Sequence, residues 1–257
     1  MRPNLAKSIL GIRNEFENKM NDITHFCKNK LTLSTDRVYV FVIKFDLFNS
    51  DDFIEILSND EINRVYEMSS AEKRRQFIIT RGITKKILAT SLGRKTSQIK
   101  FLYNQHGKPF INDKYNDYTI GFNTSHSELY GLIAITLNSE VGIDIQKIKP
   151  LQNIIALSRR FFSDNERDEL MKLAENKQRD AFYLGWVRKE SFIKAIGTGV
   201  SYGLNRFTVP LNKKENRNIV IPDSKNKKWH CYDLIEFENY KTALTTCKDN
   251  IDILISH

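Results

Sequence analysis

The apolar residues of this chain gather in short runs with the character of strands. The run at 38–47, VYVFVIKFDL, is rich in β-branched and aromatic residues, which is typical of a strand. The runs at 120–123 and 129–136 are similar, and the polar tetrapeptide TSHS joins them. Another run, at 141–145, follows the polar turn NSE. We therefore expect several short strands separated by polar turns.

Other segments carry helix signals. Over 69–92, Ser69 and Glu72 have the spacing of a capping box, and Gly93 stands where the helix would end. The strongest helical pattern covers 180–196. The remaining expected elements are a turn within 101–111, a helix over 164–175 that is opened by Ser163 and Glu166, and strands at 205–210, 218–222, 229–237 and 240–247.

The order of these elements predicts an α+β fold. Strands and helices occur in clusters rather than in strict alternation, which favours largely antiparallel sheets. The two halves share a coarse order of strands and helices, so we expect two similar subdomains, 37–138 and 139–257. Residues 1–36 predict a helical N-terminal extension, for which the sequence indicates no function.

Composition narrows the class of protein. The chain has 257 residues, of which 40% are hydrophobic, so it can bury a sizeable core. Its three cysteines lie far apart, which argues against a disulfide framework and against a CxxC metal pair. The sequence predicts neither a secretory leader nor a membrane-spanning run. We expect a cytoplasmic protein with no membrane partner.

The formal charge of +9 indicates an acidic partner. Nucleic acid is one candidate, because the helix expected over 69–92 is strongly basic. A phosphorylated small molecule and an acidic protein are the others. The sequence shows no RNP signature, zinc-finger spacing or KH-type GXXG loop. Charge alone does not decide among these partners.

Asp144 lies in the strand-like sequence VGIDI. In a strand, Val141, Ile143 and Ile145 would face one way, whereas Asp144 and Gln146 would face the other. Taken alone, Asp144 has an ordinary interpretation, as an edge-strand carboxylate that is solvated or paired with a lysine.

Glu190 lies in the helical sequence WVRKESFIKAI, where Trp186, Glu190 and Lys194 share one face. The ordinary interpretation is a surface Glu–Lys pair worth a few tenths of a kcal/mol. The indole on the same face indicates partial burial instead. A strand carboxylate and a helix carboxylate together can hold Mg²⁺, which favours oxygen ligands and substrate phosphates.

Several cations would complete such a site. Lys194, one turn beyond Glu190, could neutralise a phosphate. Donors from other segments would be His126, Lys108 and Arg81. This set suits a pyrophosphate substrate, with a metal, cationic clamps and one carboxylate able to act as a base.

These residues lie in motifs that resemble those of the 4′-phosphopantetheinyl transferases of the larger, surfactin-synthetase-activating (Sfp-like) type. The resemblance covers roughly residues 38 to 247. Its most specific part is VGID paired with W-x-x-K-E-S-x-x-K after N-x-S-H-S. The motifs are RRQFIITRGITKKIL (74–88), HGKPFI (106–111), FNTSHS (122–127), VGIDIQKIKP (141–150), RFFSDNE (160–166) and WVRKESFIKAIGTG (186–199).

The resemblance implies an activity and a fold. Members of this family transfer the phosphopantetheine arm of coenzyme A to the serine of an apo acyl or peptidyl carrier protein, and 3′,5′-ADP leaves. They act in fatty-acid, polyketide or nonribosomal-peptide biosynthesis. They are usually monomeric, with the active site between two similar halves related by a pseudo-twofold axis. We therefore expect a basic monomer with an acidic carrier as its partner and no nucleic acid.

The resemblance also implies roles for single residues. Asp144 and Glu190 would be metal ligands, and Glu190 could also deprotonate the serine. Lys194 would contact the pyrophosphate. Further residues would contact coenzyme A: Ser125 and His126 its phosphates, Lys108 and Pro109 its nucleotide, and Arg81, with Lys73 or Arg74 nearby, its 3′-phosphate. Trp186 and Lys189 belong to the motif and are expected to be mainly structural.

One position departs from the family pattern. Many members have a second acid two residues after the VGID aspartate, where this chain has Gln146. Gln146 could offer a carbonyl oxygen or hold a water, but no charge. We expect weaker Mg²⁺ binding or a changed preference between Mg²⁺ and Mn²⁺. A relative that binds carriers without catalysis remains an alternative.

The basic segment after VGIDI is a candidate docking rim for the carrier. It contains Lys147, Lys149, Arg159 and Arg160. Complementary charge would steer an acidic partner to this rim. The phenylalanines that follow have an ordinary interpretation as core residues.

Overall fold

The computed structural model describes residues 23, 31–115, 117–212, 218–219, 227–234 and 237–256. Most of the helical extension expected at 1–36 lies outside the described residues. Of its described part, Ile23, Leu31 and Leu33 are buried in the core that includes β1 (Arg37–Lys44).

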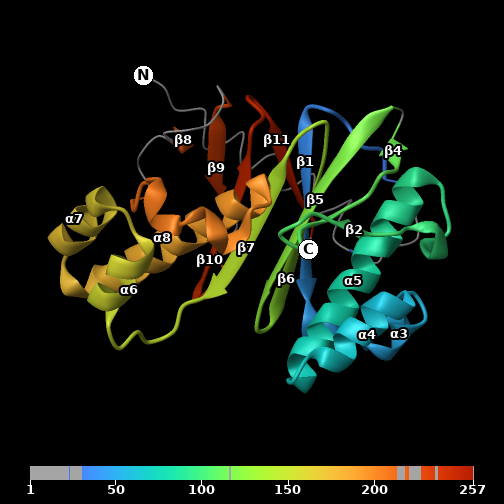
Figure 1. Cartoon of the computed structure of the whole chain (residues 1–257), viewed down its shortest axis with the longest axis horizontal. Helices are drawn as coiled ribbons and strands as arrows, with labels where there is room; N and C mark the ends of the chain where they lie inside the picture. The colour runs from blue at the N-terminus through green and yellow to red at the C-terminus, as the bar shows by residue number, and fades with distance from the viewer. Residues whose placement is uncertain are drawn as a thin grey trace.

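Two sheets form the centre of the molecule (Figure 1). The larger sheet is antiparallel except for its edge strand β11, which runs parallel to β1, and the described strands of the smaller sheet are all antiparallel. In spatial order, the larger sheet contains β11 (Asp252–Ser256), β1 (Arg37–Lys44), β6 (Tyr130–Leu137), β5 (Tyr118–Ser127) and β4 (Lys114–Tyr115). The smaller sheet contains β7 (Val141–Lys147), β10 (Tyr240–Thr246), β9 (Trp229–Asp233) and β8 (Asn218–Ile219).

Helices flank the two sheets. A separate hairpin of β2 (Leu102–Tyr103) and β3 (Pro109–Phe110) precedes the main strands of the larger sheet. The described helices are α3 (Asp51–Ile54), α4 (Asn59–Glu67), α5 (Ala71–Leu92), α6 (Ile154–Phe161), α7 (Asp164–Lys172) and α8 (Glu175–Ile196). None of them is long and apolar enough to cross a membrane.

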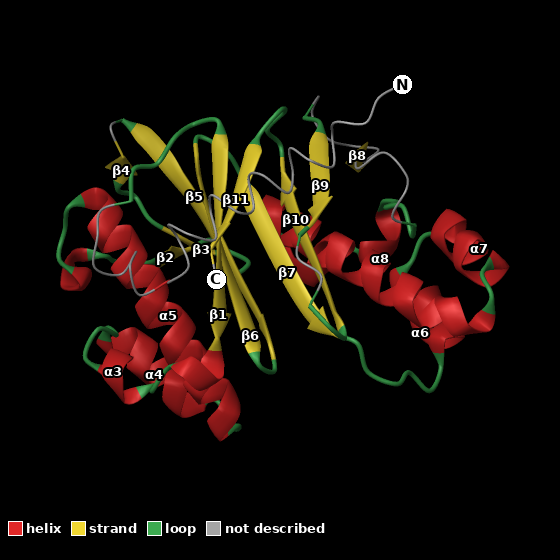
Figure 2. Cartoon of the chain, turned by 180° about the vertical axis from the view of Figure 1, so that it is seen from behind, coloured by secondary structure: helices red, strands yellow, loops and turns green. Residues whose placement is uncertain are grey.

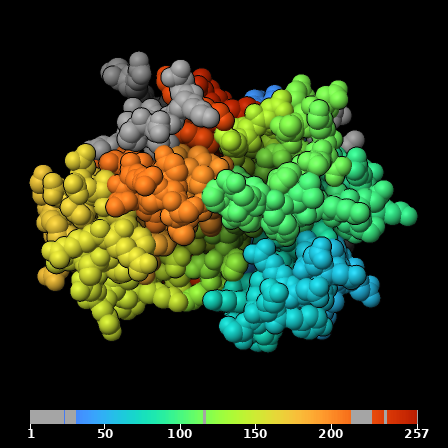
Figure 3. Space-filling model, in the orientation of Figure 1, coloured from blue at the N-terminus to red at the C-terminus, as the bar shows by residue number. Residues whose placement is uncertain are grey.

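The elements stack in four layers, helix, sheet, sheet, helix (Figures 1 and 2). One apolar cluster joins the facing sides of the two sheets, with Val38 and Val40 of β1 against Ile143 and Ile145 of β7. The alternation predicted for 141–145 is therefore confirmed. Figure 3 shows the N-terminal half, cyan to green, and the C-terminal half, yellow to orange, on opposite sides of the molecule. The prediction of an α+β fold with largely antiparallel sheets is confirmed.

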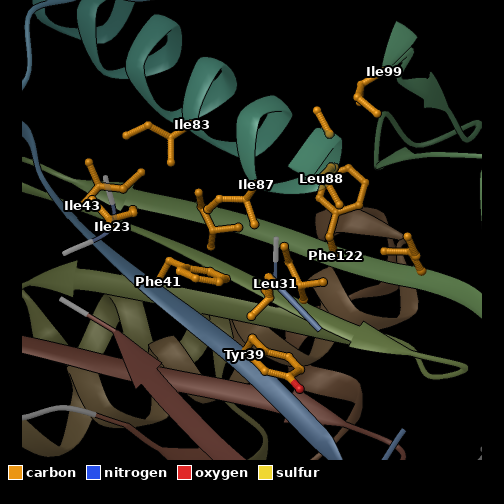
Figure 4. Close-up of a cluster of buried hydrophobic side chains, with 14 of the residues drawn as sticks. Ile23, Leu31, Tyr39, Phe41, Ile43, Ile83, Ile87, Leu88, Ile99 and Phe122 are labelled. Atoms are coloured by element: carbon orange, nitrogen blue, oxygen red, sulfur yellow. The ribbon is translucent and has the colours of Figure 1, made fainter. Parts of the chain in front are cut away.

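Helix α5 packs on the outer face of the larger sheet. Ile83 and Ile87 of α5 point toward Phe41 and Ile43 of β1 in the core (Figure 4). The predicted end of the helix is confirmed, because Gly93 adopts a left-handed φ of 64°. The predicted N-cap, Ser69, is wrong by one residue.

The N-cap of α5 is Ser70, whose side chain accepts a hydrogen bond from the backbone amide of Lys73. Ser69 and Glu72 therefore form no capping box. The capping box predicted at Ser163 and Glu166 is confirmed at the start of α7.

The tetrapeptide TSHS belongs to a strand and not to the expected turn. β5 continues to Ser127, and the chain reverses at Glu128, which has a φ of 49°. Polar residues are tolerated here because the side chains of Ser125 and Ser127 accept hydrogen bonds from backbone amides of β7.

The strand expected at 205–210 is also wrong, because Leu204–Arg206 forms a 3-10 helix. The carbonyl oxygens of Leu204 and Phe207 bind the ammonium of Lys189 at 2.7 and 2.6 Å, so a side chain replaces a neighbouring strand. Smaller differences are that β1 ends at Lys44, α7 at Lys172 and β9 at Asp233, and that α8 begins at Glu175. The elements that were not expected are α3, α4, α6, β4 and β11.

Candidate active site

Strand β7 and helix α8 approach each other closely because Gly142 has no side chain. A Cβ atom at Gly142 would lie 2.0 Å from the carbonyl oxygen of Ser191 and 2.3 Å from the amide nitrogen of Ala195. Gly142 shares a face of β7 with Asp144, and Ser191 follows Glu190 in α8. The contact therefore places the two predicted metal ligands on facing elements.

Asp144 is buried, and only one of its carboxylate oxygens has a partner among the described residues. Oδ1 accepts hydrogen bonds from Lys194 Nζ at 2.6 Å and from Ser125 Oγ at 2.8 Å. Oδ2 is buried and has no hydrogen-bond partner there. An unpaired buried oxygen of this kind is costly, so Oδ2 suits a positively charged ligand.

Glu190 is half-buried beside Asp144. Burial and, to a smaller extent, the charge of Asp144 raise the pKa of Glu190, Lys194 lowers it, and the net result is a pKa of about 7. A divalent cation between the two carboxylates would relieve this repulsion and satisfy Asp144 Oδ2. The residues present therefore fit a metal ion.

The metal shell offered by the protein is small. Within the described ranges, no group of three or more His, Cys, Asp or Glu side chains is placed to hold a metal. Gln146 is half-buried on the same face of β7 as Asp144, two residues further along the strand. The remaining coordination positions would fall to Gln146, substrate or water.

Lys194 uses its ammonium group fully. Nζ donates to Asp144 Oδ1 at 2.6 Å, to Ser125 Oγ at 2.8 Å and to the carbonyl oxygen of Ile143 at 3.3 Å. An ammonium has three donors, so a phosphate contact would replace one of these bonds. The surface Glu190–Lys194 pair of the ordinary interpretation is not among the described ion pairs, in which Lys194 binds Asp144.

His126 lies on the opposite face of β5 from Ser125. It is exposed, and its ring packs edge-on against Phe45 with ring centres 6.5 Å apart. Partial desolvation and then the nearby charge of Lys194 lower the pKa of His126. His126 and Arg81 both line a small cavity of about 50 Å³.

Arg81 is largely held by other groups of the protein. Its guanidinium lies 4.4 Å from the centre of the Phe101 ring and forms an ion pair with Glu61, with Nε 3.6 Å from Oε1. Burial lowers the pKa of Arg81. Arg74, expected nearby, instead donates to the carbonyl oxygen of Met68 at 2.5 Å.

The GKP turn is anchored to the C-terminal end of α8. Lys108 Nζ donates to the carbonyl oxygens of Ala195 at 2.7 Å and Val141 at 3.2 Å. Asn104 Nδ2 donates to the carbonyl oxygen of Gly197 at 2.8 Å. Burial lowers the pKa of Lys108 to about 8. In Figure 3 the green surface of this hairpin meets the orange surface of the end of α8.

Comparisons with known proteins identify the family. The family model described as "4′-phosphopantetheinyl transferase superfamily" matches residues 140–245, and "4′-phosphopantetheinyl transferase, N-terminal" matches residues 49–138. The 4′-phosphopantetheinyl transferase HetI of a Nostoc species is 34% identical over 216 residues, which are 83% of this chain and 89% of HetI. The chain belongs to the 4′-phosphopantetheinyl transferase superfamily.

Other relatives of this transferase are more distant in coverage or identity. The 4′-phosphopantetheinyl transferase Sfp of Bacillus subtilis is 34% identical over 180 residues, or 65% of this chain and 78% of Sfp. The human L-aminoadipate-semialdehyde dehydrogenase-phosphopantetheinyl transferase is 28% identical over 193 residues, or 68% of this chain and 62% of that protein. Enzymes of this superfamily transfer phosphopantetheine to carrier proteins.

The fold groups some of the predicted site residues around Asp144 and places the others at a distance from it. Asp144, Ser125 and Lys194 form a connected hydrogen-bonded group, and Glu190 is coupled to it by charge. The others lie around this group: His126 and Arg81 beyond the other face of β5, and Lys108 and Pro109 at the end of α8.

Sequence reasoning missed Arg64 of α4. Its guanidinium lies 5.6 Å from the centre of the Phe77 ring, and that of Arg81 lies 5.3 Å from the same centre. Arg64 also lines a cavity of about 720 Å³ together with Phe101 and Tyr103. The S-x-x-E spacing of Ser58 and Glu61 in the sequence could have predicted α4, because these residues form the capping box at the start of this helix.

The predicted docking rim is partly neutralised. Glu128, in the turn after β5, binds Lys147 at 2.5 Å and Lys149 at 2.6 Å. Arg159 and Arg160 are exposed on α6.

Proposed function

We propose that this transferase moves the 4′-phosphopantetheine arm of coenzyme A to the serine hydroxyl of an apo acyl or peptidyl carrier protein, with the help of a divalent metal ion, and releases 3′,5′-ADP. The observation that supports this most is the paired carboxylate site. Asp144 has one buried oxygen without a partner among the described residues, beside Glu190, whose pKa is raised to about 7. A cation with a bound pyrophosphate matches both features.

Asp144 and Glu190 would hold Mg²⁺, with Mn²⁺ as the other candidate. Gln146 would add a carbonyl oxygen or hold a water. When bound, the ion would supply positive charge beside the pyrophosphate. Because the protein offers two carboxylates, we expect water to fill more of the shell than in a site with three acids.

The transfer exchanges one phosphorus–oxygen bond for another. The serine oxygen of the carrier bonds to the β-phosphorus of coenzyme A, and the bond from that phosphorus to the bridging oxygen breaks. The bridging oxygen leaves with 3′,5′-ADP. The serine proton passes to Glu190, directly or through a water.

Lys194 would stabilise the charge that develops on the leaving group. Its weakest bond, at 3.3 Å to the carbonyl oxygen of Ile143, is the one that a phosphate oxygen would replace most easily. Ser125, at 2.8 Å from Lys194 Nζ, and His126 on the other face of β5 would contact the phosphates of coenzyme A.

The nucleotide of coenzyme A would lie along the turn of Lys108 and Pro109. Arg81 would meet the 3′-phosphate, and we add Arg64 to this group because both guanidinium groups lie beside the Phe77 ring. Arginine is suited to this role by its planar set of donors.

The remaining features belong to the same proposal. The halves 37–138 and 139–257 would be pseudo-twofold related, except that β11 of the second half joins the sheet of the first beside β1. The active site would lie between the halves, and the enzyme would be a cytoplasmic monomer. Its charge of +9 would favour an acidic carrier, such as one of nonribosomal-peptide or polyketide synthesis, over nucleic acid.

The test is direct. The protein is incubated with Mg²⁺, coenzyme A and a panel of apo carriers, and mass spectrometry follows the carriers. We expect one or more carriers to gain the mass of phosphopantetheine, and the Asp144→Asn variant to lose this activity while Asp164→Asn, an exposed carboxylate on α7, keeps it. Carrier binding without any mass gain would contradict the proposal and favour a scaffold.

A further inference from the structure

Strand β7 carries Asp144 at the edge of its sheet. In the described part of that sheet, β7 pairs with β10 and with no second strand. An edge strand leaves a row of backbone amides and carbonyls without ladder partners. Because this edge is largely buried, those groups need partners from elsewhere.

The amides of this edge bind side chains of β5. Asn123 Oδ1 accepts from the amide of Ile143 at 2.9 Å, and Ser125 Oγ accepts from the amide of Ile145 at 3.4 Å. The row is then completed by Ser127 Oγ, which accepts from the amide of Lys147 at 3.0 Å. Side chains of alternate residues in β5 thus accept hydrogen bonds from the backbone amides of alternate residues in β7.

The carbonyls of the same edge bind two lysines. Lys108 Nζ donates to the carbonyl oxygen of Val141, and Lys194 Nζ donates to that of Ile143. The edge of β7 is therefore closed by side chains instead of by a strand. Ser125, Lys108 and Lys194 already have proposed roles at the site, whereas Asn123 and Ser127 have none.

Asp144 lies between the two most buried bonds of this row. The amides of Ile143 and Ile145 flank it, and both hydrogen bonds are buried. Ser125 also donates to Asp144 itself, so its loss would have several effects. Asn123 is buried and touches the edge through its bond to the amide of Ile143. A substitution at Asn123 therefore tests only the effect of holding the backbone beside Asp144.

We propose that Asn123 is a positioning residue, which holds the β7 backbone so that the Asp144 carboxylate meets the metal ion and the substrate in the correct place. The inference rests on the proposed metal site at Asp144 and Glu190. Loss of groups that orient a metal ligand typically lowers metal affinity by about 10- to 100-fold.

The matched variants come from the same row of hydrogen bonds. Asn123→Leu removes the acceptor and roughly keeps the volume, whereas Asn123→Asp keeps an acceptor oxygen. Ser127→Ala removes the same type of bond at Lys147, three residues beyond Asp144. Asn123→Ser serves if the leucine variant does not fold, because its shorter side chain withdraws the oxygen from the Ile143 amide.

The first readout is Mn²⁺ binding to the protein alone, measured by electron paramagnetic resonance. We expect Asn123→Leu to weaken binding by about tenfold or more, Asn123→Asp to recover most of it, and Ser127→Ala to leave it unchanged. Hydrogen exchange at the Ile143 amide should accelerate in Asn123→Leu. In turnover, a higher metal concentration should restore part of kcat, with little change in KM for coenzyme A.

Folded Asn123→Leu or Asn123→Ser protein with the Mn²⁺ affinity of the parent would overturn the inference. Equal weakening by Ser127→Ala would also do so, because it would mean general loosening of β7. A parent protein that binds no Mn²⁺ and transfers nothing would instead contradict the proposed function, so the two failures are distinguishable.

Discussion

Three carboxylates are buried among the described residues, and they differ in how completely other groups of the protein satisfy their oxygens. Glu166 binds Lys189 at 2.7 Å and accepts from the amides of Ser163 and Val209. Glu61 is similarly held by Lys85 at 2.6 Å. Asp144 alone of the three leaves an oxygen without a partner in the described structure. A buried carboxylate that the fold leaves half-satisfied is the one suited to bind something else.

The metal preference can be tested at Gln146. We expect Gln146→Glu to lower the Mg²⁺ concentration needed for half-maximal activity, because a third carboxylate adds charge on the face of β7 that carries Asp144. Gln146→Ala is the control and should not lower it. A Gln146→Glu variant with the metal dependence of the parent would show that this position lies outside the metal shell.

Lys108 should make stability depend on pH. Its pKa is lowered from 10.5 to about 8 in the folded protein, so between these values the unfolded chain binds more protons than the folded one. The contribution of Lys108 to stability is therefore complete above pH 10.5 and lost as pH falls through about 8. Urea unfolding should show the parent gaining stability relative to Lys108→Met as pH rises through this window. A constant difference would contradict the expectation.

At the scale of elements, β7 and α8 act as a pair because their backbones touch at Gly142. Lys189 fixes the other side of α8 through Glu166 and through the carbonyls of Leu204 and Phe207. The hairpin of β2 and β3 holds the C-terminal end of the same helix through Lys108. These contacts set the position of Glu190 relative to Asp144.

A methyl group at position 142 should separate the pair. In Gly142→Ala the new Cβ would lie 2.0 Å from the Ser191 carbonyl oxygen, which is backbone and cannot turn away. We expect a loss of about 3 kcal/mol or more in the free energy of unfolding, together with loss of Mn²⁺ binding. Thermal unfolding and calorimetric titration measure both.

Gly131→Ala is the matched control for this change. Its Cβ would lie 3.0 Å from the tip of the Phe45 ring, which can rotate. Its cost should be clearly smaller and its Mn²⁺ binding retained. Equal costs for the two variants would mean that the β7–α8 contact has no special role.

At the scale of the whole molecule, the turn after β5 connects the two halves. Gln76 of α5 donates to the carbonyl oxygen of Glu128 at 2.8 Å, while the Glu128 carboxylate binds Lys147 and Lys149. Exposed ion pairs of this kind contribute little to stability. Their larger effect is on the field that an approaching acidic protein meets.

The docking rim can be tested by changing its charge. Reversing Lys147 and Lys149 to Glu should raise the KM for the carrier several-fold and leave the KM for coenzyme A unchanged, because the charge of this surface steers an acidic partner. Glu128→Gln should act in the opposite direction, since it releases both lysines from their ion pairs. The effects should shrink at high salt. An unchanged carrier KM in the double reversal would remove the rim from the docking surface.

Features of the fold and of the site could be predicted from the sequence where they depend on interactions between residues that are close together in the chain. The alternation of VGIDI predicts which side of β7 carries Asp144, and the helical spacing in α8 places Trp186, Glu190 and Lys194 on one face, because these patterns follow from local backbone geometry. Motif resemblance then identified the family. The turn expected at TSHS was wrong because its hydroxyl groups bind a strand that lies about 20 residues further along the chain.

The sequence by itself determined the α+β class, the two longest helices and the family, and it predicted the residues of the central site, since periodicity, capping and motif spacing are local. Only the tertiary structure decided which partner each charged group takes. It paired Lys194 with Asp144 instead of Glu190, placed Lys108 at the end of α8, and set Asn123 beside the backbone of Ile143. Those choices depend on contacts between segments far apart in the chain, which the close approach at Gly142 and the side-chain-closed edge of β7 bring together.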